Sequence, residues 1–450
     1  MSHENPTLPS DDIVEATAVA TTKQSPDEPR SRSASSLLRA AEIDTRLLGM
    51  IAALIVIWIL FHFLSGGTFL TARNLWNLSV QSSVVAIMAT GMVLVIVTRN
   101  IDLSVGSMLA AVGMAMALLQ AEILPDWLGI GHPLIWPITL AAGIALGAAI
   151  GTLQGSIVAY IGVPAFIVTL GGLLVWRGVA WWMASGRTIA PMDEKFQVLG
   201  GGSSGTIGGT WTWILAIIGC VAVVALMWRR RSQRIKFGFD PRPMWAEVTI
   251  GTILVAGIIV GAAVINSYPM PQRLAQIYAE ENGIEWFPGL EIPLGLATPV
   301  LLVIVVAVIM HFIATRLRYG RYVYAIGGNP DAAVLAGIKT RWTIVKTFMI
   351  MGVLVALAAA VQIARLNAAT SGLGQLAELY VIAAAVIGGT SLNGGVGTIP
   401  GAILGAVVMQ SLVSGMVLMG MEAPLQDIVV GIVLVIAVAL DTYYRKRVSA

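Results

Sequence analysis

The chain has 450 residues, of which 57% are hydrophobic and only 11% charged, and its formal net charge is +3. A mean hydropathy of +0.84 excludes an ordinary soluble domain and is typical of a polytopic membrane protein. The few Lys and Arg residues gather in connecting loops, which argues against nucleic acid as a partner. The single cysteine, Cys220, excludes an intramolecular disulfide.

Residues 1–46 differ in composition from everything that follows. They are rich in Pro, Ser, Asp and Glu and carry few large apolar residues, which predicts a disordered tail because little apolar surface is available for burial. Acidic residues and prolines stand where a secretory signal would need its apolar core. We therefore expect the first membrane segment to act as the insertion signal and to remain.

The region 47–441 predicts an all-α, polytopic transmembrane bundle of about ten to twelve spanning segments, followed by a short basic cytoplasmic tail at 442–450. Apolar runs of roughly 17 to 25 residues, enough to cross about 30 Å of hydrocarbon as helices, recur throughout it. The predicted segments are 47–65, 79–97, 104–121, 136–160, 165–184, 211–228, 248–267, 294–313, 344–364, 378–392, 398–419 and 427–441.

Two pairs of segments are interrupted by polar turns that contain glycine. The first break, TRNIDLSVGS, lies at 98–107, and the second, GGTSLNGGVGT, at 388–398. Corresponding broken helices in the two halves of a chain indicate a transport path; two ordinary tight hairpins are the alternative. At the predicted segment ends, Asp102 or Ser104 is expected to cap a helix, and a proton relay through Asp102 and Glu378 is the competing interpretation.

Other features predict orientation and packing. Basic residues cluster after 228 and after 313, which places these loops and both termini in the cytoplasm. Arg177, the deepest cation, is expected to reach the interface beside Trp181 and Trp182 or to pair with a carboxylate. The small residues of AAGIALGAAIGTLQG, 141–155, predict close packing of one helix against another.

The cytoplasmic segment 314–343 contains the signals of one short helix. Asn329 can cap it, Pro330 suits its first position, and Asp331 favours the positive end of its dipole. The helix is expected from Pro330 to Ala336, with Gly337 in left-handed geometry behind it. Such a helix between basic flanks is expected to dock into a partner's groove; an interfacial helix resting on lipid headgroups is the alternative.

The sequence contains no constellation that would indicate an enzyme. Its four histidines are scattered without metal-ligand spacing, and the dipeptide Gly-Lys is absent, which excludes a Walker A phosphate loop. We expect a chain that binds no cofactor itself, so any ATP would be bound by another subunit.

Four separated motifs resemble the permease subunits of ATP-binding-cassette sugar importers, the ribose, galactoside and xylose branch. They are IDLSVGSM (101–108), PAFIVTLGGLLVWRG (164–178), RYVYAIGGNPDAAVLAGIKTRW (321–342) and AAAVIGGTSLNGGVGTIPGAILGA (383–406). The additional hairpin at about 211–267 is similar to the xylose-type permeases.

This resemblance implies a multi-pass homodimer in a bacterial inner membrane that imports a monosaccharide, such as the pentose D-xylose, through a weakly selective path. Its partners would be membrane lipid, a periplasmic sugar-binding protein and cytoplasmic ATPase subunits that use ATP and Mg. ATPase contacts would come from Asn329, Pro330, Asp331, Ala332, Ala333, Leu335, Ala336 and Gly337. The path would be lined by Asp102, Ser104, Gly106, Glu378, Thr390 and Ser391. A proton- or sodium-coupled secondary transporter of a small polar solute is the alternative.

Overall fold

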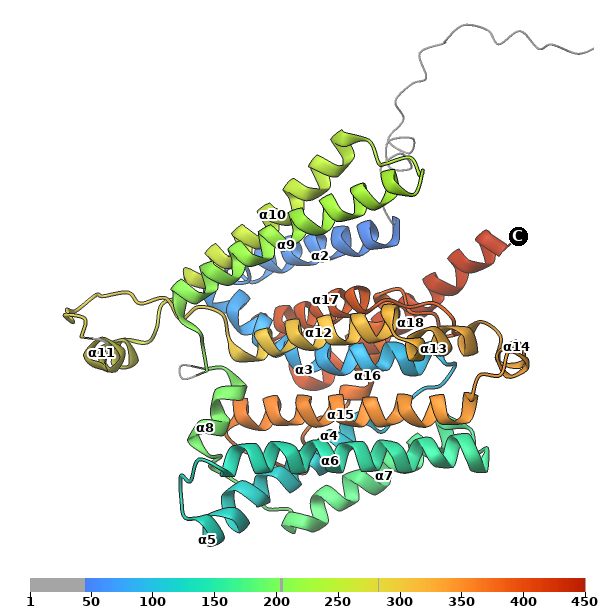
Figure 1. The fold of residues 1–450 in the computed structure, drawn as a ribbon. Helices are drawn as coiled ribbons and strands as arrows, with labels where there is room; N and C mark the ends of the chain where they lie inside the picture. Colours follow the sequence, from blue (N-terminus) through green and yellow to red (C-terminus); the bar gives the residue numbers. More distant parts are fainter. Residues whose placement is uncertain (1–44, 203–204, 282, 450) are drawn as a thin grey trace, which may run out of the picture.

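The computed structural model describes residues 45–202, 205–281 and 283–449, and within them the fold is helical, with isolated bridges in place of strands. The predicted all-α class is confirmed. Figure 1 shows the long helices stacked roughly side by side across the molecule. They are α2 (Thr45–Leu64), α3 (Ala72–Val97), α4 (Val105–Leu118), α6 (Ile135–Ser156), α7 (Ala165–Ala184), α9 (Gly208–Lys236), α10 (Met244–Asn266), α12 (Thr298–Arg316), α15 (Thr340–Leu366), α17 (Ile399–Leu418) and α18 (Ala423–Ser449).

Ten helices of the described region are long and apolar enough to cross a membrane, and two shorter apolar helices lie at Ala377–Ile387, named α16, and at Ala423–Ala439 within α18. Together they account for the twelve predicted segments. The start of α2 and the end of α18 lie at the same end of the bundle as the short helix α14 (Pro330–Leu335) (Figure 1). We refer to this end as the α14 side.

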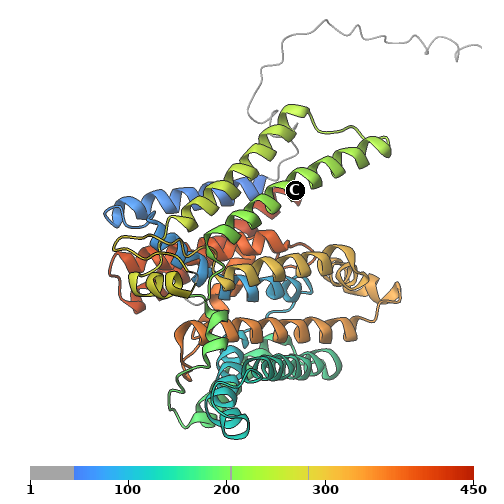
Figure 2. The same cartoon turned by 60° about the vertical axis from the view of Figure 1, so that its left-hand side comes forward.

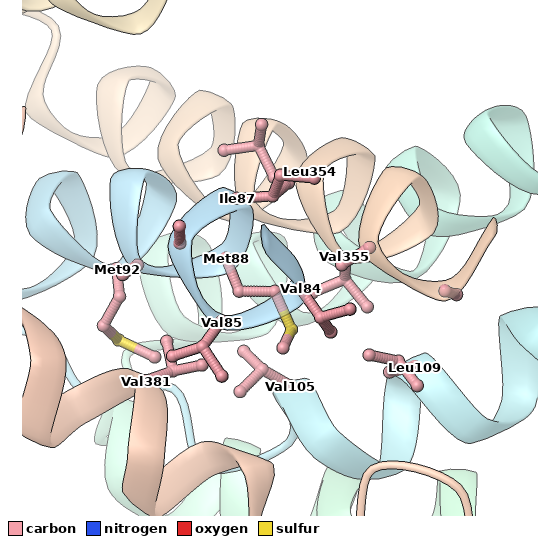
Figure 3. Packing of buried hydrophobic residues seen from close by; sticks show 14 of the residues in the cluster. Val84, Val85, Ile87, Met88, Met92, Val105, Leu109, Leu354, Val355 and Val381 are labelled. Carbon is pink, nitrogen blue, oxygen red and sulfur yellow. The ribbon is translucent and has the colours of Figure 1, made fainter. Parts of the chain in front are cut away.

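Helix α3 forms the centre of the core. It is buried along most of its length, because neighbouring helices cover it on every side. Figure 3 shows Met88 and Met92 of α3 among valines and leucines of α4, α15 and α16. By contrast, α9 and α10 are largely exposed and extend from the rest of the bundle as a hairpin (Figure 2).

The predicted close packing of the small residues at 141–155 is confirmed. Gly147, Gly151 and Gly155 recur at intervals of four on α6 and face α15, where a Cβ atom at any of them would collide with the backbone of the facing helix. Gly352 of α15 meets Gly147 in the same way. The backbones of α6 and α15 are therefore in direct contact along this face, as small residues in membrane helices allow.

Several boundaries differ from prediction. Helix α3 begins at Ala72, before the predicted 79, because the Thr71 hydroxyl accepts a hydrogen bond from the Asn74 amide and caps it. Helix α9 continues past the apolar run to Lys236, since Arg and Lys are good helix formers. Further helices in the described part of the chain lie outside the predicted spans: the short α5 (Leu124–Leu128) and α8 (Glu194–Gln197), and the longer α11 (Gln272–Glu281) and α13 (Arg318–Gly328). The predicted tail 1–46 falls almost entirely outside the described residues, and 442–449 continue α18.

Candidate functional site

The first break folds back into the protein between α3 and α4. Asp102 is only 1% exposed, and Ser104 is fully buried. One carboxylate oxygen of Asp102, Oδ1, accepts hydrogen bonds from the Ser104 amide at 2.9 Å and from the Ser104 hydroxyl at 2.6 Å. The same hydroxyl lies 3.0 Å from Oε1 of Gln154 on α6. Among the described residues, Oδ2 of Asp102 has no hydrogen-bond partner.

The expectation that Asp102 or Ser104 would cap α4 at a segment end is therefore wrong. Ser104 occupies the N-cap position of α4, but its side chain accepts no hydrogen bond from an amide of the helix. The Asp102 carboxylate instead accepts a hydrogen bond from the Ser104 amide two positions later, a turn that Asp side chains commonly form. Hydropathy measured the length of the apolar runs but did not show that the polar link between them returns to the interior.

The first turn of α16 lies against the first turn of α4. A Cβ atom on Gly106 would collide with the Gly374 carbonyl oxygen and with the Glu378 carboxylate. Glu378 is 7% exposed, and its Oε2 has no partner among the described residues. We call Asp102, Ser104, Gly106, Gly374 and Glu378 the helix-start cluster. Two helix N-termini, which carry partial positive charge, thus meet beside two buried carboxylates.

Arg177 on α7 supports the segment that leads into α16. Its Nη1 donates hydrogen bonds to the carbonyl oxygens of Ser371 at 2.8 Å and Leu373 at 2.6 Å. The expected position beside Trp181 and Trp182 is wrong, because main-chain carbonyls within reach satisfy the guanidinium inside the protein. This contact holds 371–373 against α7.

The second break places Thr390 and Ser391 apart from the helix-start cluster. Both are buried in a compact turn in which the Ser391 amide donates to the Val396 carbonyl at 2.8 Å. Glu378 lies in the first turn of α16, and the second break follows the last residue of this helix, Ile387. The nine residue steps from Glu378 to Ile387 span about 14 Å at 1.5 Å per residue. The structure therefore divides the predicted path residues into two groups, one at each end of α16.

Both breaks meet the C-terminal end of α13, which leads through Asn329 into α14. The Gly395 amide donates to the Val97 carbonyl at 3.0 Å, which joins the second break to the first. Arg99 in the first break donates to the carbonyl oxygens of Gly327 and Gly328 at 2.9 and 2.8 Å. We call this meeting point, formed by 97–99, 324–328 and 394–397, the three-way junction.

Tyr324 of α13 completes the three-way junction. Its hydroxyl donates to the Gly397 carbonyl oxygen at 2.7 Å, and burial raises the pKa of this hydroxyl, so that it remains a donor. Sequence reasoning identified neither Tyr324 nor the contacts of Arg99, because each partner is a main-chain carbonyl distant in sequence. The turn glycines at 327–328 and 394–395 were the only signal of a close backbone approach.

Helix α14 forms as predicted. The Asn329 Oδ1 accepts a hydrogen bond from the Ala332 amide at 3.0 Å, and Gly337 adopts a φ of +78°. The Ile338 and Gly337 amides close the end of the helix by donating to the carbonyls of residues 333 and 334.

The exposed face of α14 differs in part from the predicted one. Leu335 is 90% exposed and Val334 57% exposed, so these two residues present the largest apolar side chains of the helix. Ala333 is only 4% exposed and packs inward. Val334 was not among the predicted contacts, although its place beside Leu335 in a short capped helix could have suggested it.

The comparisons with known proteins agree with this architecture. A family model described as "Branched-chain amino acid transport system / permease component" matches residues 74–242 and 241–438. The xylose transport system permease protein XylH of Escherichia coli strain K12 is 37% identical over 406 residues, covering 90% of this chain and 94% of the relative. XylH of Haemophilus influenzae is 36% identical, covering 91% and 100%. The ribose import permease protein RbsC of Escherichia coli strain K12 is 32% identical, covering 83% and 87%. No solved structure matches significantly.

Proposed function

The chain belongs to the permease family of ATP-binding-cassette sugar importers, and from this premise we propose that it forms the inner-membrane path for a pentose such as D-xylose. One observation carries the choice of sugar. Two xylose permeases match at 36–37% identity over at least 90% of the chain, whereas the ribose permease matches at 32% over 83%. The path runs past the helix-start cluster and along α16.

The energy for import comes from ATPase subunits that dock on α14. Val334 and Leu335 enter an apolar groove of the ATPase, and ATP and Mg²⁺ are bound there and not by this chain. The three-way junction supports this assignment, because Arg99 bonds directly to the turn before α14 and Tyr324 bonds to the second break. Movement of the docked helix is thereby passed to both breaks.

The α14 side faces the cytoplasm. Basic residues cluster on this side, in the last turns of α9 and between the end of α12 and the start of α15. Lys and Arg near the ends of membrane segments favour the cytoplasmic side. The complete path is a homodimer of this chain, surrounded by lipid, and a sugar-binding protein delivers the substrate from the opposite face.

A secondary transporter is the second candidate because Asp102 and Glu378 are buried and each has a carboxylate oxygen without a hydrogen-bond partner among the described residues. Intramembrane acids of this kind can relay protons. Their position at two helix N-termini offers another explanation, since the positive ends of helix dipoles stabilise carboxylates.

Reconstitution into liposomes tests the proposal. The chain is inserted together with its ATPase and binding protein, and uptake of labelled xylose is measured with ATP, with a non-hydrolysable ATP analogue, and with an imposed proton gradient alone. Uptake only with hydrolysable ATP supports the importer. Uptake driven by the proton gradient without the partner proteins would establish the secondary transporter instead.

A further inference from the structure

A cavity of about 410 Å³ lies between α3, α15, α17 and the segment before α16. Its polar lining comes from four glutamines on these separate elements together with Thr370 and Arg365. The glutamines are Gln81, Gln362, Gln375 and Gln410. We call it the amide cavity. Its volume lies within the range of about 300–1,000 Å³ that is usual for small-molecule sites.

The chemistry of the amide cavity fits a neutral polyol. Each glutamine offers two N–H donors and a carbonyl acceptor, so that a hydroxyl group can both donate and accept at the same side chain. Gln410 and Gln81 already bond to each other, from Nε2 to Oε1 at 3.1 Å, which orients both amides and leaves each with unused capacity. Val84, Val85 and Met88 supply an apolar wall for the C–H face of a sugar ring.

The amide cavity lies on the side opposite α14. Gln362 and Leu366 are near the C-terminal end of α15. The first residue of this helix, Thr340, lies at the opposite end, a few residues after α14. The 27 residues of this helix span about 40 Å. A solute reaching the cavity therefore enters from the face that the proposed function assigns to the outside.

The amide cavity borders on the helix-start cluster through Gly374. Gly374 and Ala377 line the cavity, and the Gly374 carbonyl oxygen and the Ala377 Cβ atom also lie against Gly106 at the start of α4. The Leu109 side chain, one turn further along α4, also lines it. The contact between α4 and α16 thus closes the cavity toward the α14 side.

We propose that the amide cavity is a low-affinity sugar-binding site, filled from the external face, in which a pentose waits before the contact between Gly106 and Gly374 opens. This inference rests on the proposed function and adds to it the site and the residues that contact the sugar. Low affinity is expected because a neutral pentose forms no ion pair with Arg365, the charged residue of the lining, and because a transport path must release its substrate.

Direct occupancy is tested by labelling. In a Cys220→Ala background, which removes the only cysteine, Gln362→Cys is reacted with a polar thiol reagent added from outside, with and without millimolar D-xylose. We expect xylose to slow labelling at least twofold. Gln276→Cys on the exposed helix α11 is the matched control and should react equally fast in both conditions. Equal rates at Gln362→Cys with and without xylose would overturn the proposal.

Transport gives a second readout. The double variant Gln81→Leu/Gln410→Leu removes both partners of one hydrogen bond, which limits damage to folding because no buried amide is left unpaired. With saturating loaded binding protein, we expect the xylose uptake rate to fall about tenfold while ATPase stimulation by the binding protein persists. Gln276→Leu should keep the wild-type rate. Unchanged uptake in the double variant would reject the amide cavity, whereas failure of the wild-type complex to import with ATP would reject the proposed function.

Discussion

Replacing Arg99 by alanine is expected to uncouple ATP hydrolysis from transport. The change removes both hydrogen bonds from the first break to the carbonyls of Gly327 and Gly328. The two bonds come from a charged donor, but Arg99 is exposed, and we take about 1 kcal/mol for each instead of the larger buried value. A loss of about 2 kcal/mol shifts the equilibrium between a joined and a parted three-way junction by about 30-fold.

The assay measures xylose uptake and phosphate release in the same proteoliposomes. The sugar transported per ATP hydrolysed should fall by up to about 30-fold in Arg99→Ala, while hydrolysis stimulated by the binding protein continues. Arg99→Lys keeps the charge but replaces two separate donor nitrogens by one ammonium group, and its ratio should be intermediate. Tyr324→Phe removes one bond of the same junction and should lower the ratio less than Arg99→Ala does.

Arg187→Ala is the matched control. Arg187 is an exposed arginine at the other end of the bundle, and its 3.5 Å ion pair with Glu122 is at the surface, where such pairs contribute little. Its sugar-to-ATP ratio should equal that of the wild type. The reasoning is refuted if Arg99→Ala assembles with the ATPase and keeps the wild-type ratio.

Three further predictions concern other parts of the path. Gly106→Ala should lower the melting temperature by an amount equivalent to about 1–3 kcal/mol, because the new Cβ would overlap a buried carboxylate of α16; Gly171→Ala, with open space around it, should not. Leu335→Glu should abolish co-purification of the ATPase without affecting membrane insertion, since the side chain is exposed; retained co-purification would remove α14 from the interface. Asp102→Asn should keep most transport because Oδ1 can still accept from Ser104, whereas a proton relay requires Asn to be as inactive as Ala.

The membrane segments and α14 could be predicted because their signals are local. An apolar run of sufficient length specifies a spanning helix wherever it packs, so all twelve predicted segments have a helical counterpart. The cap at Asn329 and the left-handed Gly337 depend only on residues a few positions away. These features required no knowledge of the tertiary structure.

The depth of the breaks could not be predicted from such signals. Asp102 is buried because α4 and the following helices enclose the link, and the contact between Gly106 and Gly374 joins residues that are distant in sequence. A hydropathy profile treats the polar residues at 98–104 as a surface loop whether they reach water or return to the interior. For the same reason the main-chain partners of Arg99 and Arg177 could not be predicted from the sequence, because every residue has a carbonyl group and none marks itself as a partner.

The arrangement of α16 explains how distant parts of the path can act together. Its first turn forms the floor of the amide cavity at Ala377, and the segment after its last residue reaches the three-way junction at Gly395. An 11-residue helix with most of its side chains buried moves as one body, because close packing resists internal deformation. A displacement of α14 by the ATPase, carried through Arg99 and Tyr324, therefore requires only this one helix to alter the contact between Gly374 and Gly106 that closes the cavity.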